Sequence, residues 1–360
     1  MSALPRYTLE PLPRLDDLAR AWQALEPLAS PSFFTSWAWI GSLLETMPER
    51  GAMALLRGVA MGDTVALAVL GRHTTWRHGL LRTHGLFLNR SGDPRLDCTF
   101  IEYNGLLARR SCAGATLDHF ADWFLAEAPD ADELHLSGIL APAQPAHGAL
   151  QTVQSLPTFS VDLTRVGDAG GDVAALLSPN TRQQLRRALH AYDADGKLRL
   201  REAAVRDEAL AFFDGLKRLH VASWQRRGKA HAFANPHFET FHRHLIEHHT
   251  ACVQLLQIAA GDHVLGYLYN LRRDGHVYAY QSGFADADRK RRPGVISHYL
   301  AINHNHARGA RIYDFMAGRN RLKESFATDR HTLYWQIVQR PCLKYRLEHA
   351  ARAVKGMLYG

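Results

Sequence analysis

The sequence predicts an α+β protein built from two similar halves. Its 360 residues exceed the usual size of one compact domain. Each half predicts helices followed by antiparallel strands, and then a further helix and strand, a pattern that favours mixed sheets over a doubly wound parallel sheet. A proline-rich stretch of small residues over 141–148 separates the halves. We therefore expect an N-terminal unit over 1–150 and a C-terminal unit over 151–360.

In the first half, the period of the apolar residues changes from helical to strand-like. Leu15, Leu18, Trp22 and Leu25 have the spacing of one helix face. The turn Met61-Gly62-Asp63 is typical of a hairpin between two strands. Helices are expected at 15–28, 36–47 and 116–127, and strands at 52–60, 64–70, 80–88, 98–103 and 134–139.

The second half has clearer start and stop signals. Ser178-Pro179-Asn180 begins a basic helix, and Asp195-Gly196 follows its end. Two short turns, 260–262 and 273–275, separate three strands in meander order. Helices are expected at 181–192, 207–226, 236–250 and 294–308 and from 341 onward, and strands at 159–163, 253–259, 264–272, 276–284, 311–316 and 332–338.

Composition indicates an ordinary globular protein. Hydrophobic residues make up 46% and charged residues 22%, which excludes global disorder. No apolar run approaches the roughly 20 residues of a membrane-spanning helix, and the N-terminus lacks the pattern of a secretory signal. The four cysteines lie far apart without a CxxC pair, which predicts reduced thiols. We therefore expect a soluble, cytoplasmic protein.

The positive charge is concentrated near the C-terminus. From Asp286 onward, 15 Lys and Arg residues stand against 6 Asp and Glu residues, which accounts for the whole net charge of +8. A local surplus favours an anionic ligand, such as cofactor phosphates, a nucleic acid or an anionic membrane. A solvated basic surface would give the same count.

The segment 281–297 is the strongest candidate for binding phosphate. A strand ends there, four basic residues follow from Arg289 to Arg292, and Pro293-Gly294 opens a helix. Proline suits the first helical turn, glycine lets a ligand approach the backbone, and the helix start attracts phosphate. An ordinary strand-to-helix loop with exposed charges remains the alternative.

Other familiar chemical motifs are missing. No GxSxG, GxGxxG or GxxxxGK[ST] pattern occurs, which argues against a serine hydrolase, a Rossmann cofactor and a P-loop nucleotide. His244 and His248 share one helix face, but no HExxH glutamate accompanies them. We expect no metal site, and we expect the histidines over 242–249 to be exposed.

Five motifs occur in an order that resembles a known family. They are Trp224-Gln-Arg-Arg-Gly228, Tyr278-Ala-Tyr-Gln-Ser-Gly-Phe284, Arg292-Pro-Gly294, Tyr313-Asp-Phe-Met-Ala-Gly318 and Lys323-Glu-Ser-Phe326. Together they resemble GNAT-superfamily acyltransferases of the CelD type, associated with cellulose and exopolysaccharide synthesis and related to the Fem aminoacyltransferases. The resemblance covers about 180–326. Trp37 and Glu102-Tyr-Asn104 resemble the family's N-terminal half.

The resemblance implies two tandem GNAT-like units, each a twisted mixed sheet flanked by helices. It also implies acyl transfer to an amine, with acyl-CoA as the donor. In the family pattern, the loop and helix start bind the donor pyrophosphate. The implied donor-binding residues here are Arg289, Arg291, Arg292, Gly294, Val295 and Ile296. Ile296 stands where the superfamily has a small residue, which leaves the usual CoA pose in question.

The same resemblance implies candidate catalytic and substrate-binding residues. Lys323 matches the family's motif lysine and could stabilise an oxyanion or bind a donor phosphate, although Leu322 replaces the tyrosine before it. Asp314 is the first candidate base, or a structural carboxylate that pairs with Arg319. Tyr280 is a further catalytic candidate. The candidates for binding the acceptor are Trp224, Arg227, Tyr278 and Gln281.

Three functions remain open at this point. The first is an acyl-CoA-dependent N-acyltransferase whose acceptor is a small-molecule or envelope-precursor amine. The second is a Fem-like transferase that takes its acyl group from aminoacyl-tRNA, which the basic C-terminal part would suit. The third is a non-catalytic binding protein of an envelope-polysaccharide system. Salt dependence separates the first two, because tRNA binding weakens steeply with ionic strength.

Overall fold

The computed structural model describes residues 4–77, 79, 81–112, 114–128, 130–285, 290–345 and 348. They form two compact units. Unit 1 contains the described residues up to Ser155 and from Leu333 onward, and unit 2 is Leu156–Thr332. The second half expected from the sequence therefore differs from unit 2, because the end of the chain returns to unit 1. None of the described helices is long and apolar enough to cross a bilayer.

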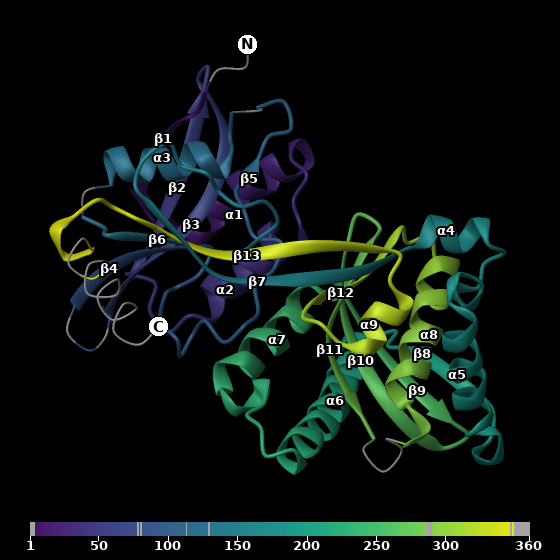
Figure 1. Ribbon diagram of the computed structural model, residues 1–360. Helices are drawn as coiled ribbons and strands as arrows, with labels where there is room; N and C mark the ends of the chain where they lie inside the picture. Colours follow the sequence, from purple (N-terminus) through teal and green to yellow (C-terminus); the bar gives the residue numbers. More distant parts are fainter. Residues whose placement is uncertain are drawn as a thin grey trace, which may run out of the picture. The chain divides into compact units, whose positions relative to one another are not determined.

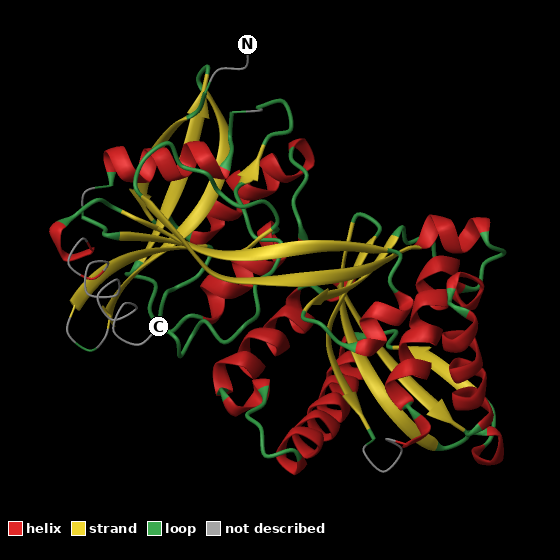
Figure 2. Ribbon diagram, viewed as in Figure 1, coloured by secondary structure: helices red, strands yellow, loops and turns green. Residues whose placement is uncertain are grey.

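Unit 1 is a sheet with helices on it (Figures 1 and 2). Its hydrogen-bonded strand order is β1-β2-β3-β4-β6-β13, and β5 pairs with β3. Its strands are β1 (Arg6–Pro11), β2 (Met53–Ala60), β3 (Asp63–Arg77), β4 (Leu81–Leu88), β5 (Leu107–Ala108) and β6 (Glu133–Ile139). Its helices are α1 (Leu15–Leu25), α2 (Trp37–Thr46) and α3 (Leu117–Glu127), with 3₁₀ turns η1 (Glu26–Leu28) and η2 (Phe33–Thr35).

Unit 2 repeats this plan, with the strand order β8-β9-β10-β11-β12-β7. Its strands are β8 (Leu198–Glu202), β9 (Val253–Ala260), β10 (His263–Arg273), β11 (His276–Phe284) and β12 (Ile312–Ala317). Its helices are α4 (Leu163–Asp168), α5 (Pro179–His190), α6 (Arg206–Arg226), α7 (Pro236–His248), α8 (Pro293–Ala307) and α9 (Arg321–Phe326). Its 3₁₀ turns are η3 (Val173–Leu176), η4 (Asp193–Asp195), η5 (Ala232–Ala234) and η6 (Thr250–Cys252).

Two long strands contribute to both units. They are β7 (Ala149–Asp162) and β13 (Asp329–Gln339), and each crosses the boundary between unit 1 and unit 2. Within unit 2, α6 and α7 lie on one side of the strands and α5 and α8 on the other (Figure 1). The strand order and helix placement confirm the expected α+β fold of two similar units.

The two units match residue by residue in their strand registers. The β2–β3 hairpin begins with Ala60 opposite Asp63, and the β9–β10 hairpin begins with Ala260 opposite His263. Both hairpins also shift register after two pairs. The parallel pairs β4–β6 and β11–β12 each comprise three residue pairs. Equivalent positions can therefore be assigned across the units: Asp314 corresponds to His135, His276 to Gly85 and Tyr278 to Phe87.

Each unit has its own apolar core. In unit 1, Phe120 and Phe124 of α3 pack on Leu70 and Leu86 of the sheet. In unit 2, fully buried residues of α8 pack on the corresponding face of β9, β10 and β12. These faces show the period-two alternation of half-buried strands, which is why the meander strands were predictable.

Several elements differ from the sequence-based expectations. Residues 98–103 are not a strand, since they belong to an irregular segment in which Tyr103 has a φ of 52°. Strand β7 is much longer than expected and begins directly after the proline-rich stretch. Strands β1 and β8 and helix α9 were not expected, because each is too short to show a clear period.

Candidate functional site

The parallel strands β11 and β12 of unit 2 separate part-way along their length. They pair at three successive positions, of which Tyr278 with Asp314 is the last, although both strands continue. Just beyond, β11 bulges at Tyr280, and β12 bulges after Asp314, where Met316 has a φ of 62°. Beyond this point, the facing backbone N–H and C=O groups of β11 and β12 do not pair with each other. They can hydrogen-bond to other partners.

Asp314 and His276 form a hydrogen-bonded pair where the strands separate. Asp314 is 2% exposed, and its Oδ2 lies 3.2 Å from Nε2 of His276. Its Oδ1 accepts the backbone N–H of Met316 at 2.6 Å. The imidazole of His276 stacks on the ring of Tyr278, with centroids 4.0 Å apart. Because both carboxylate oxygens accept hydrogen bonds, Asp314 is placed to orient His276.

Lys323 binds the end of β12. Its Nζ donates to the carbonyl of Met316 at 3.1 Å and to that of Ala317 at 2.6 Å. The side chain of Asn320 accepts the N–H of Lys323 and caps α9. This cap fixes the backbone position of Lys323. Burial, and then the charge of Lys323, lower the pKa of His298 to about 3. The ammonium group of Lys323 thus binds the carbonyls of Met316 and Ala317, which follow Asp314 by two and three residues.

Helix α8 begins without a side-chain cap from its N-cap residue. Arg292 occupies its N-cap in the left-handed conformation, with a φ of 59°, and Pro293 is the first helical residue. A Cβ on Gly294 would lie 3.2 Å from the ring of Phe284, so this helix turn sits close to the end of β11. The start of α8 can offer the N–H of Gly294 and a favourable dipole to an anion. Pro293 has no N–H, and those of Val295 and Ile296 donate to the carbonyl of Arg292. Arg289 lies outside the described residues.

The arginines before α8 attach their loop to α5. Arg291 lies over the ring of Tyr192, 3.8 Å from its centroid, and pairs with Asp195 at 2.6 Å. The Nη1 of Arg292 donates to Oε1 of Gln184 at 2.6 Å. These contacts hold the loop in place, whether or not the same side chains also contact a donor.

The two hydrophobic residues of the first turn of α8 differ in burial. Ile296 is fully buried in the core of unit 2, and Val295 is half-buried against it. The isoleucine that departs from the family pattern therefore packs in the core.

Tyr280 faces a buried histidine of α7. Its ring centroid lies 4.9 Å from that of His242 and 5.9 Å from that of Tyr269. His242 is fully buried, its Nδ1 lies 3.2 Å from the Tyr269 hydroxyl, and burial lowers its pKa to about 3. The expectation that this histidine is exposed was wrong, because it packs among the aromatic rings of α7 and β11.

Trp224 contacts a second buried histidine, His220, near the end of α6. Its ring stacks on His220 with centroids 5.5 Å apart. The Nδ1 of His220 lies 3.0 Å from the carbonyl of Ser282 in β11. A Cβ on Gly283 would lie 2.4 Å from the carbonyl of Leu216 in α6, so only glycine allows this approach.

The other two candidates for binding an acceptor make local contacts. Arg227 is the C-cap of α6, and its Nη2 donates to Oγ of Ser223 at 2.8 Å. Gln281 accepts the N–H of Ser282 through its own side chain at 3.0 Å. Neither contact brings the residue to Asp314.

The structure thus brings some of the candidates together. Asp314, Tyr278 and Lys323 gather at the point where β12 leaves β11. His276 and His220 were missed by the sequence analysis. His276 could have been found, because it alternates with Tyr278 and Tyr280 in one strand. No sequence signal indicated His220, whose environment depends on the packing of α6 against β11.

In unit 1, the corresponding gap between β4 and β6 is closed by the chain itself. The N–H of Asn104 donates to the carbonyl of Gly138 in β6 at 3.0 Å. Its side-chain Nδ2 donates to the carbonyl of Leu88 in β4 at 3.0 Å, and its Oδ1 accepts from Asn89 at 2.8 Å. The side chain of Thr116 caps α3. Among the described residues, unit 1 therefore has a bridged gap and a capped helix at the positions that correspond to the parted strands and to α8 of unit 2.

This arrangement agrees with the comparison to protein families. Residues 179–324 match the acetyltransferase (GNAT) domain. The matched segment begins at α5 and ends in α9, so it contains β11, β12, α8 and all of the candidate site residues. No curated protein matches the sequence significantly.

Solved structures share the fold over most of the chain. FemX aligns with a TM-score of 0.55 at 10% identity, over 91% of this chain and 96% of that one. A conserved protein of unknown function from Bacteroides thetaiotaomicron aligns with a TM-score of 0.52 at 9% identity, over 93% and 100%. The C-terminal domain of a putative lysylphosphatidylglycerol synthetase from Agrobacterium fabrum gives 0.51 at 10% identity, over 90% and 92%. At these identities the likeness concerns the fold alone.

Proposed function

We propose that the protein is an N-acyltransferase that moves an acyl group from acyl-CoA to an amine. One observation carries this proposal: unit 2 keeps a parted strand pair that leads into an uncapped helix, whereas unit 1 has closed the same gap. The parted strands of unit 2 can hydrogen-bond an extended ligand such as a pantetheine arm. The start of α8 can bind its phosphates.

The donor would lie along β11 with its phosphates at α8. Lys290 and Arg292 are exposed at this helix start. Arg186 and Arg187 of α5 are also exposed, and α5 packs against α8. These cations attract a donor that carries several negative charges. We propose that Gly294 contributes its backbone N–H, since the N–H of Val295 already donates to the carbonyl of Arg292 at 3.0 Å.

The Asp314–His276 pair supplies the proton chemistry in this proposal. The acceptor nitrogen attacks the acyl carbonyl carbon, the C–S bond of the thioester breaks, and one N–H proton must leave the nitrogen. We assign its removal to His276, with Asp314 as the positioning carboxylate. The proton finally neutralises the departing CoA thiolate.

Fem-like use of aminoacyl-tRNA is the second candidate. The FemX fold match and the basic C-terminal part favour it. Its phosphate contacts would make binding strongly salt-dependent. A rise in salt from 50 to 200 mM should weaken tRNA binding far more than acyl-CoA binding.

The decisive experiment compares two substitutions in the first turn of α8. Val295→Glu places a negative charge where donor phosphates would lie, yet suits the helix dipole. Val295→Gln is the matched neutral control, with the same loss of packing. Binding of acetyl-CoA and longer acyl-CoAs is measured by thermal shift, because a ligand of the folded state raises Tm.

We expect acyl-CoA to raise the Tm of the parent protein and of Val295→Gln, and to lose this effect with Val295→Glu. Equal shifts in the two variants would overturn the placement of the donor at α8. Absence of any shift with every acyl-CoA would overturn the donor assignment and leave aminoacyl-tRNA to be tested in the same way.

A further inference from the structure

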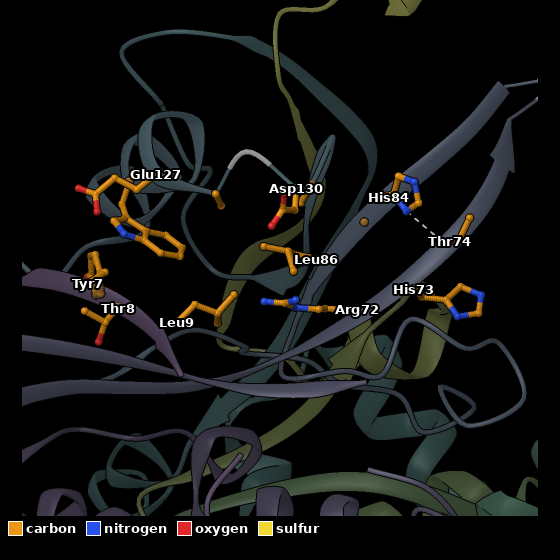
Figure 3. Close-up of a pocket in the computed structure, with 14 residues that line it drawn as sticks. Tyr7, Thr8, Leu9, Arg72, His73, Thr74, His84, Leu86, Glu127 and Asp130 are labelled. Carbon is orange, nitrogen blue, oxygen red and sulfur yellow. Dashed lines mark hydrogen bonds between the residues drawn. The ribbon is translucent and has the colours of Figure 1, made fainter. Parts of the chain in front are cut away.

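Unit 1 contains a cavity with a volume of 580 Å³ at one end of its sheet. Helix α3 has 11 residues and spans about 16 Å, whereas β3 has 15 residues and spans about 50 Å. The helix therefore covers Leu70 but not Arg72 and Thr74, which follow on the same face. Arg72, Leu9, Leu86 and Asp130 surround the middle of the cavity (Figure 3).

The equivalent place in unit 2 holds a half-buried carboxylate. Arg72 corresponds to Arg272, and Leu9 corresponds to Glu202, because each pair has the same register in its sheet. The Oε1 of Glu202 lies 3.0 Å from Nη1 of Arg272, and its Oε2 lies 2.8 Å from Nε2 of His304. Although burial opposes ionisation, hydrogen bonds from His304 and Gln254 and nearby arginine charges lower the pKa of Glu202 to about 2.

Unit 1 retains the arginine of this arrangement and lacks the acid. Leu9 stands at the position of Glu202, and the exposed guanidinium group of Arg72 makes no hydrogen bond or ion pair with any described residue. Beside it, the Thr74 hydroxyl lies 3.1 Å from Nδ1 of His84. The cavity thus adjoins the position that a carboxylate occupies in unit 2, and it is bordered by an arginine that has no acidic partner among the described residues.

We propose that this cavity binds a small organic monocarboxylate, whose carboxylate pairs with Arg72 as Glu202 pairs with Arg272. A planar guanidinium group suits a carboxylate through two parallel hydrogen bonds. Leu9, Leu86 and Trp123 provide an apolar wall for a compact hydrocarbon body. Glu127 and Asp130 also line the cavity and repel a second negative charge. The site therefore prefers monocarboxylates to dicarboxylates and phosphates.

The test uses 4-methylpentanoate as the probe, with its uncharged amide and glutarate as comparison ligands. Binding to the full chain is measured by isothermal titration calorimetry. We expect 4-methylpentanoate to bind and the amide and glutarate to bind about tenfold or more weakly, because a charge-assisted hydrogen bond is lost or a repulsion is added. Equal binding of the acid and its amide would overturn the proposal, as would no binding of 4-methylpentanoate.

Two variants at residues that line the cavity locate the site. Arg72→Ala removes an exposed cation and should weaken 4-methylpentanoate binding about tenfold or more. Leu9→Glu supplies the carboxylate that unit 2 already has, so it should abolish binding, and its Tm measures the packing that Leu9 contributes to the core of unit 1. Val295→Glu in unit 2 should leave this binding unchanged, which separates the cavity from the proposed donor site. Undiminished binding in both Arg72→Ala and Leu9→Glu would place the ligand elsewhere.

Discussion

Oδ2 of Asp314 lies 3.2 Å from Nε2 of His276, and this pair occurs in unit 2 alone. At the equivalent positions, unit 1 has His135 and Gly85, which cannot form it. Nε2 of His135 instead lies 3.1 Å from Oε2 of Glu133 in its own strand. The Asp–His pair therefore occurs in unit 2, the unit in which the parallel strands β11 and β12 separate. That coincidence is the basis for assigning proton transfer to unit 2.

Asp314→Asn should reduce acyl transfer without weakening donor binding. The amide can still accept the Met316 N–H, but it no longer offers a charged acceptor to Nε2 of His276. We expect kcat to fall about a hundredfold, within the range of general acid–base effects, with KM for acyl-CoA unchanged. CoA release with a panel of amines measures the effect, and His135→Asn in unit 1 is the matched control. Full activity in Asp314→Asn would remove this carboxylate from the mechanism.

Lys323→Met should destabilise the fold. Two strand-end carbonyls lose a charged donor, and leaving such buried acceptors unpaired costs about 1–3 kcal/mol. Urea unfolding measures the change, with Lys290→Met, at an exposed lysine, as the control. Unchanged stability would show that water replaces the ammonium group at no cost. A loss of transfer larger than the loss of folded protein would assign Lys323 to the chemistry as well.

The protein should bind one acyl donor per chain. Asn104 bridges β4 and β6 of unit 1 and occupies the space that the parted strands leave in unit 2. A calorimetric titration with acyl-CoA should give a stoichiometry of one, and Val295→Glu should abolish the signal. A stoichiometry of two, halved by Val295→Glu, would show that unit 1 opens to a second donor.

Much of the fold was predictable because its elements are long and periodic. The meander strands of unit 2, helix α6 and the start of α8 follow from alternation, turn residues and the Pro293-Gly294 pair. The segment 98–103 was not, because its apolar residues belong to a loop that Asn104 fixes between two strands. The residue-by-residue equivalence of the strands in the two units could not be deduced from the sequence either. The loops between matching strands differ in length.

The candidate site was predictable only in part. Motif residues such as Asp314 and Lys323 do lie together, because Asp314 is in β12 and Lys323 binds the end of the same strand. Their partners could not be deduced, since His276 reaches Asp314 across a parallel strand pair that is distant in sequence. The contacts of Arg291 with Tyr192 and Asp195 likewise depend on how α5 packs beside α8.

Acid should destabilise the protein through its buried histidines. The pKa of His242 and that of His298 are each lowered to about 3, chiefly by burial. An unfolded chain takes up these protons near pH 6.5, so the histidines favour the folded state fully above that pH and progressively less as pH falls toward 3. Each histidine should cost about 1.4 kcal/mol per pH unit in this range.

His242→Phe should reduce this acid sensitivity. The free energy of unfolding is measured by urea at pH 6.5 and pH 4.5, a window above the range in which Glu202, whose pKa is lowered to about 2, loses its own contribution. Phenylalanine keeps the aromatic contacts and does not titrate, so the loss of stability over the window should shrink by about 1.4 kcal/mol per pH unit. His147→Gln, at an exposed histidine, serves as the control and should keep the parent slope. An unchanged slope in His242→Phe would mean that His242 becomes protonated without leaving the folded state.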